Sequence, residues 1–170
     1  MKHFEVYVYI EGDFVSIFQT RFANSALCYV RNKDLSQAFF LIKNITLDDK
    51  DGSRTHVNSR IFLGGVQIYK SKNEIKPEYI ETLKKKLTTI FKTDGSRMYF
   101  PDGPFTTPEV IDICGGWFTE LVVEVEPRRR SIFFFSDRDK ERPAYNHQAS
   151  HKFGRTLYGD VLFIDENFIS

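Results

Sequence analysis

Basic side chains gather in the C-terminal third of the sequence, beginning with three consecutive arginines at 128–130. Guanidinium groups pair with carboxylates or phosphates through several hydrogen bonds at once. Aromatic rings interleave with the basic residues further along, and such rings stack on bases or anchor protein interfaces. The pattern predicts a partner-binding surface made of Arg128, Arg129, Arg130, Arg138, Arg142, Tyr145 and Arg155.

A solvated, charge-balanced face is the structural alternative for this segment. Acidic residues alternate with the basic ones at Asp137, Asp139 and Glu141, and they dilute the local positive field. Glu124 and Glu126 are also expected to face arginines across a hairpin, where opposite charges attract. Because of this dilution we expect a protein partner ahead of RNA or DNA, and a nucleic-acid-binding module is the first alternative.

Residues 137–151 also contain groups that do chemistry in other proteins. His147 and His151 have the spacing of two zinc ligands on a helix, but no third ligand is evident nearby. Asp137 and Asp139 resemble a magnesium pair, although basic neighbours would neutralise them. Cys114 would be a nucleophile only if it were exposed beside a base such as His147. A small hydrolase with its site in this loop is therefore the second alternative.

No complete catalytic set is apparent, so the sequence assigns no catalytic residue, no metal and no cofactor. No glycine loop for phosphate binding is present either. The predicted function is a non-catalytic macromolecule-binding protein that acts through the basic and aromatic surface. We expect a small accessory or inhibitor factor of the kind that mobile elements encode.

The scaffold expected for these residues is α+β, with a mostly antiparallel sheet of about eight or nine short strands. Phenylalanine accounts for 17 of the 170 residues, and bulky aromatics suit pleated sheet surfaces. The clearest hairpin joins 117–125 to 131–135 and places the three arginines at its tip. Other expected strands are 4–10, 14–22, 26–30, 61–69, 97–100 and 156–164; residues 34–47 fit a helix or a strand, and we favour a strand.

Two helices are expected. Ile80, Leu83 and Leu87 recur at helical spacing after Pro77, which predicts one amphipathic helix over about 77–92. Thr107 fits a helix cap, Pro108 the first turn and Glu109 a carboxylate near the helix dipole, which predicts a second, short helix over about 108–113.

Length and charge bound the remaining expectations. A chain of 170 residues suits a single domain over 1–170, and a net charge of +1 argues against a surface that tracks a polyanion throughout. Cys28 and Cys114 have apolar neighbours and are expected to be buried, reduced thiols. No signal peptide and no apolar run of about 20 residues is evident, so we expect a cytoplasmic protein without a membrane partner.

Overall fold

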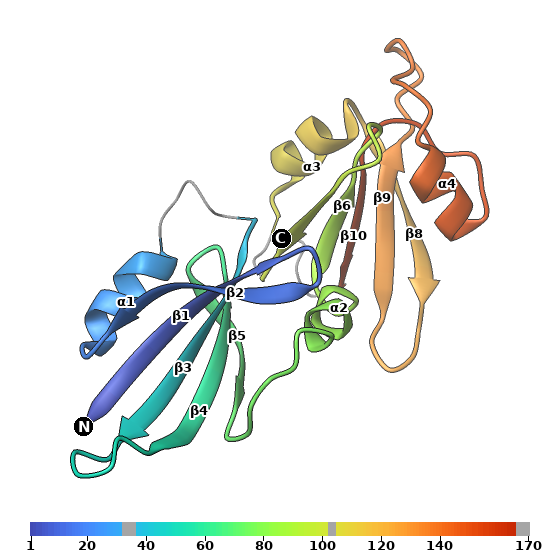
Figure 1. The fold of residues 1–170 in the computed structure, drawn as a ribbon. Helices are drawn as coiled ribbons and strands as arrows, with labels where there is room; N and C mark the ends of the chain where they lie inside the picture. The colour runs from blue at the N-terminus through green and yellow to red at the C-terminus, as the bar shows by residue number, and fades with distance from the viewer. Residues whose placement is uncertain (32–36, 102–104, 166–170) are drawn as a thin grey trace. The chain divides into compact units, whose positions relative to one another are not determined.

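The computed structural model describes residues 1–31, 37–101 and 105–165 (Figure 1). The chain divides into two compact units, Met1–Lys86 and Leu87–Ser170. The described residues form ten strands and four helices, and the strands make two five-stranded antiparallel sheets, one in each unit. The α+β class and the antiparallel pairing are confirmed, although the strand count slightly exceeds the expected eight or nine. That the units act as one domain stays a prediction.

The first unit is a sheet with a helix on each face. Its strands lie in the order β2-β1-β3-β4-β5. In chain order its elements are β1 (Lys2–Ile10), β2 (Asp13–Thr20), α1 (Ala23–Val30), β3 (Phe39–Leu47), β4 (Arg54–Leu63), β5 (Val66–Ser71) and α2 (Tyr79–Lys84).

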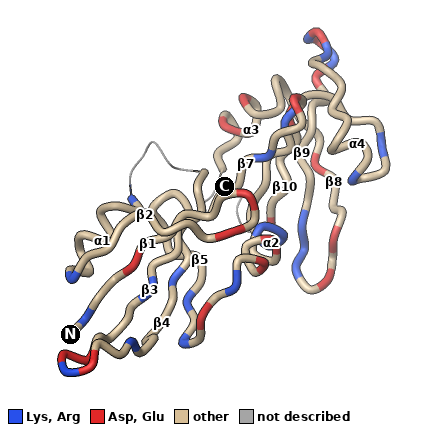
Figure 2. The backbone as a smooth tube through the Cα atoms, in the orientation of Figure 1, with Lys and Arg blue, Asp and Glu red and all other residues tan. Residues whose placement is uncertain are grey.

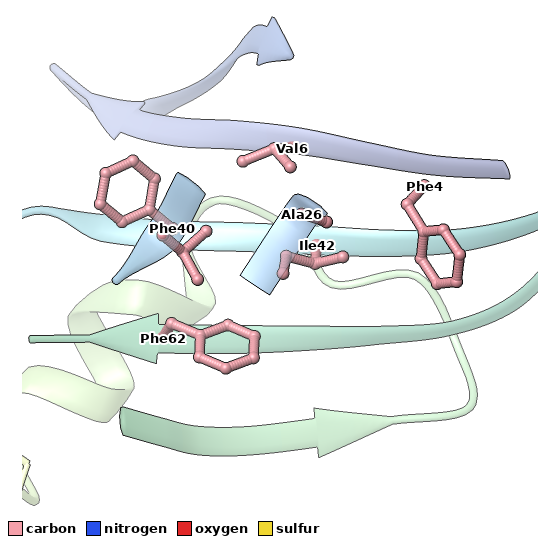
Figure 3. Packing of buried hydrophobic residues seen from close by; sticks show 7 residues of the cluster. Phe4, Val6, Ala26, Phe40, Ile42 and Phe62 are labelled. Carbon is pink, nitrogen blue, oxygen red and sulfur yellow. The ribbon is translucent and has the colours of Figure 1, made fainter. Parts of the chain in front are cut away.

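Alternation along the strands sends apolar side chains under α1. Val6, Ala26 and Ile42 are completely buried there (Figure 3). Helix α2 lies against the opposite face, because Tyr9 Oη donates a 3.0 Å hydrogen bond to Glu81 Oε1. The sheet of the first unit therefore has two differently covered faces, a point that matters for the polar residues described below.

The second unit has three layers. Its strands lie in the order β7-β6-β10-β9-β8, so the last strand of the chain is central. Its elements are β6 (Thr88–Phe91), β7 (Arg97–Phe100), α3 (Thr107–Cys114), β8 (Phe118–Glu124), β9 (Arg130–Phe135), α4 (His147–Phe153) and β10 (Val161–Asp165). Val110 and Cys114 of α3 pack against one face of this sheet, and Ala149 of α4 packs against the other.

The short helix and the main hairpin are confirmed. Helix α3 covers the predicted 108–113, but its cap is Thr106, one residue before the expected Thr107. The Thr106 hydroxyl accepts a hydrogen bond from the Glu109 N–H, and the Glu109 carboxylate accepts one from the Thr106 N–H. Strands β8 and β9 pair with Glu124 opposite Arg130, and the side chains of these two residues approach to 4.0 Å. The expected charge pairing across the hairpin is therefore present at this position.

The helix predicted over 77–92 is wrong beyond its first part. Only Tyr79–Lys84 is helical, and Thr88–Phe91 is strand β6. All four residues of β6 are buried, and the β-branched Thr88, Thr89 and Ile90 favour a strand. The apolar residues of the short helix and of the buried strand after it together have the spacing expected of one longer helix. The boundary between the two units also falls inside this segment.

Three further boundaries differ from the expectation. Residues 26–30, expected as a strand, belong to helix α1. The expected strand 61–69 is the end of β4 and the start of β5, joined by a tight turn in which Gly64 and Gly65 have positive φ. The expected strand 156–164 begins only at Val161, as β10. Residues 39–47 form β3 as favoured, and 34–36 lie outside the described residues. Within the described ranges, no helix has both the length and the apolar character needed to cross a membrane.

Candidate functional site

A groove of about 400 Å³ lies on the second unit, where the chain leaves β9 towards α4. Its lining is mostly basic and aromatic and consists of Phe135, Ser136, Asp137, Arg138, Lys140, Arg142 and Tyr158. Two of the predicted partner-binding residues, Arg138 and Arg142, therefore lie in one concave site.

The first end of the loop is held by the strand pair below it. Ser136 N–H donates to Trp117 O at 2.8 Å, which extends the β8–β9 pairing by one step. The Asp137 carboxylate then accepts hydrogen bonds from the N–H groups of Trp117 and Asp139. Gly116 is required beside it, because a Cβ there would lie 2.9 Å from the Phe135 ring. Asp137 is thus mainly an anchor of the loop.

The second end of the loop is held by the buried side chain of Asn146. Its amide Nδ2 donates to the carbonyls of Phe91 and Gly159, each at 2.8 Å, while its Oδ1 accepts from Ala149 N–H and caps α4. Gly159 itself has a positive φ, and a Cβ there would lie 2.9 Å from Cys114 O. The groove therefore stands on a rigid base.

Basic and acidic side chains of the loop lie in different places. Arg138, Lys140 and Arg142 line the groove, whereas Asp139 and Glu141 are exposed and do not line it. Figure 2 shows this alternation of basic and acidic residues between β9 and α4. With Asp137 as the one carboxylate among the lining residues, the groove carries an excess of positive charge. Asp139 and Glu141 therefore lower the net positive charge of the loop more than they lower the positive charge of the groove.

Tyr158 lines the groove, and further aromatic rings continue from it towards α4. The guanidinium of Arg142 lies 4.4 Å from the centroid of the Tyr158 ring, within the range of a cation–π contact. Tyr145 contacts Tyr158 edge-on at 5.7 Å and His147 at 4.6 Å between ring centroids. The structure therefore brings Arg138, Arg142 and Tyr145 together.

The three tip arginines lie elsewhere. Arg128 and Arg129 sit in the β8–β9 turn and Arg130 is the first residue of β9, at the opposite end of that strand from the groove (Figure 1). Arg128 and Arg129 are exposed, and Arg128 forms a 3.0 Å ion pair with Asp165. Arg155 is also apart from the groove, with its guanidinium 5.5 Å from the Phe134 ring centroid. The seven predicted residues therefore do not form one continuous site.

Arg130 is buried, with 4% of its side chain exposed. Its Nε lies 2.9 Å from Asp165 Oδ1, its Nη2 donates to Leu87 O, and its guanidinium stacks 3.8 Å above the Phe163 ring. Burial lowers the pKa of Arg130, and the charge of Asp165 opposes that shift. These contacts tie the hairpin to the sheet, so we leave Arg130 out of the candidate binding surface.

The histidine and cysteine side chains that could take part in catalysis do not form a site among the described residues. His147 and His151 do lie on one helix, α4, but the described residues contain no cluster of three His, Cys, Asp or Glu side chains suited to a metal. Cys114 is buried as expected, and burial together with the charge of Asp160 raises the pKa of its thiol to about 12. The expected burial of Cys28 is wrong, because α1 turns this residue outward.

Sequence reasoning missed a second polar cluster, on the first unit. Glu5, Tyr7, Lys43, Arg54 and His56 come from three neighbouring strands and surround a small pocket. The strand period of two already places Glu5 and Tyr7 on the face opposite Phe4 and Val6, which is the signal that was available. The partners from β3 and β4 follow only from the register.

Comparison of this chain with protein families, curated proteins and solved structures found no match.

Proposed function

We propose that this protein is a non-catalytic binding protein whose groove beside β9 receives an acidic segment of a protein partner. One observation carries the proposal: three cationic side chains of a single loop converge on one concave site, while the acidic residues between them stay outside it. Carboxylates are the protein groups that arginine and lysine pair with most strongly. An accessory or inhibitor role and a cytoplasmic place in the cell belong to the same proposal.

Two features favour a protein partner over a nucleic acid. The near face of the Tyr158 ring is covered by Arg142, so it does not offer that face to a base. Asp137 lies in the wall and repels phosphates, and a chain with a net charge of +1 has little long-range attraction for a polyanion. A short run of Asp and Glu side chains does not need long-range attraction, because it can bind through ion pairs with the groove cations alone.

The test measures binding of a synthetic peptide rich in Asp and Glu. The groove variant is Arg138→Glu with Arg142→Glu, and the control is Arg21→Glu with Lys70→Glu, which changes the net charge equally on the first unit. We expect the groove variant to bind at least tenfold more weakly, since one charge-assisted hydrogen bond is worth about 1.5–3 kcal/mol. The control should bind as the parent does, and all three proteins should unfold at similar denaturant concentrations.

Equal peptide affinity in the parent and the groove variant contradicts the proposal. A single-stranded oligonucleotide of matched charge is measured in parallel. If it binds more tightly than the peptide, with an affinity that falls steeply as salt rises, the nucleic-acid alternative replaces this one.

A further inference from the structure

The missed polar cluster surrounds a pocket of about 140 Å³ on the first unit. The pocket opens on the face of the sheet that α2 also contacts, and β1, β3 and β4 provide its floor. Its lining residues are Glu5, Tyr7, Lys43, Ile45, Arg54, His56 and Glu74. Lipid-sized or drug-sized ligands need about 300–1,000 Å³, so this volume suits only a compact group.

The negative charge of Glu5 is already balanced. Arg54 Nη2 donates to Glu5 Oε1 at 2.5 Å, and Tyr7 Oη donates to the same oxygen at 3.0 Å. Burial alone would raise the pKa of Glu5, but the hydrogen bonds from Arg54 and Tyr7 outweigh it and the pKa is lowered. Glu5 is therefore ionised and occupied, and it acts as a fixed support for Arg54.

Lys43 is the more loosely paired of the two cations that line the pocket. Its side chain is 20% exposed, yet its ammonium makes no hydrogen bond with any residue in the described ranges. The nearest carboxylate oxygen, Glu74 Oε1, is 3.7 Å away, and the Tyr7 ring centroid is 4.9 Å away. An ammonium has three donors, and polar groups that are largely withdrawn from water normally have acceptors.

Arg54 adds further donors at the mouth of the pocket. Its side chain is 54% exposed, and its hydrogen bond to Glu5 uses one of the five N–H groups of a guanidinium. Glu74 stands opposite with 68% of its side chain exposed, so its carboxylate is a weakly held competitor at the rim. Lys43 and Arg54 thus present donors to the same small space.

We propose that this pocket binds a compact anion through a single carboxylate or phosphate group held between Lys43 and Arg54. The anion gives the Lys43 ammonium a closer acceptor than the Glu74 carboxylate, and it displaces that carboxylate from the rim. The Glu5 carboxylate stays in place and orients Arg54. This site belongs to the first unit and is independent of the groove proposed above.

The experiment titrates the full chain with inorganic phosphate and, separately, with acetate, and follows backbone amide shifts and the heat of binding. We expect saturable binding with the largest shifts around residues 43 and 54. Lys43→Gln should weaken binding by roughly tenfold or more, because it removes a charge-assisted contact. The matched control Lys70→Gln, an exposed position on β5, should bind as the parent does.

Glu74→Gln should tighten binding, since it removes the competing negative charge while preserving the fold. This variant decides the matter if Lys43→Gln fails to fold. Tighter binding of phosphate identifies a phosphate group as the ligand chemistry, and comparable binding of acetate identifies a carboxylate. The proposal is overturned if neither anion shows saturable binding, or if Lys43→Gln or Glu74→Gln leaves the affinity unchanged.

Discussion

The three consecutive arginines of the β8–β9 turn share a residue type but not an environment. Arg128 and Arg129 are exposed, whereas Arg130 is buried against Phe163 and paired with Asp165. The sequence placed all three at a hairpin tip, which is right for Arg128 and Arg129, whereas Arg130 is the first residue of strand β9. It did not separate them, because Asp165 is 35 positions away and becomes a neighbour only through the pairing of β9 with β10.

Replacing Arg130 by methionine tests this distinction. The change leaves the partly buried Asp165 with one arginine, Arg128, and removes the hydrogen bond to Leu87 O. We expect a loss of about 3 kcal/mol in the free energy of unfolding, the lower end of the range for breaking a buried pair. Lys70→Ala, at an exposed position on β5, should change it by no more than about 0.5 kcal/mol. Urea unfolding measures both, and equal effects would show that Arg130 has no special structural role.

The two thiols give a second test at the scale of single residues. Cys28 is exposed and should react rapidly with a thiol reagent in the native protein, while Cys114 should react only after denaturant is added. The pKa of Cys114 is raised to about 12, well above the roughly 8.5 of a free thiol. Its neutral form therefore contributes stability that is complete below about pH 8.5 and is lost as the pH rises towards 12. Labelling of Cys114 as fast as that of Cys28 would contradict its burial.

Elements with local signals were predictable. Helix α3 carries its own cap, proline and first-turn carboxylate, and the β8–β9 hairpin carries alternation and a turn. Strand β6 carries no such signal, because residues distant in the sequence bury it: Ile90 packs with the residues of α3 and Phe91 with those of α4. Its apolar residues continued the spacing of α2, so the sequence joined two elements that belong to different units.

The side chain of Asn146 connects helix α4 to Phe91 of strand β6 and to Gly159, so replacing it tests how the elements are held together. Asn146→Ala removes the cap of α4 and leaves the carbonyls of Phe91 and Gly159 without their donor. A cap is worth about 1 kcal/mol and an orphaned buried polar group about 1–3, so we expect a loss of roughly 2 kcal/mol or more. Amide exchange should also accelerate in residues 143–159.

The control for Asn146 is Asn24→Ala, at an exposed position in α1, which should have little effect because alanine is a good helix former. Comparable losses in the two variants would mean that the buried amide does not hold the loop. Unchanged exchange in 143–159 would mean the same.

Across the whole molecule, composition predicted the fold class well and the site only in part. The excess of phenylalanine matched a sheet-rich fold. Of the predicted surface, Arg138 and Arg142 line the candidate groove, while Arg128 and Arg129 lie at the hairpin tip. Whether one of these residues lies at the groove or at the hairpin tip depends on which end of β9 it is near. The distance between these two places is a property of the tertiary fold. The net charge of +1 does not reveal the groove either, because acidic residues elsewhere in the chain offset the three cations that line it.

The most direct test of the binding proposal is a map of the surface that an acidic peptide contacts. Backbone amide shifts of the full chain are recorded while a peptide rich in Asp and Glu is added. The largest changes are predicted in residues 135–142 and at Tyr158, with little change in the β8–β9 turn at 126–130. Changes centred on that turn, or on no contiguous surface at all, would contradict the assignment of the groove as the partner-binding site.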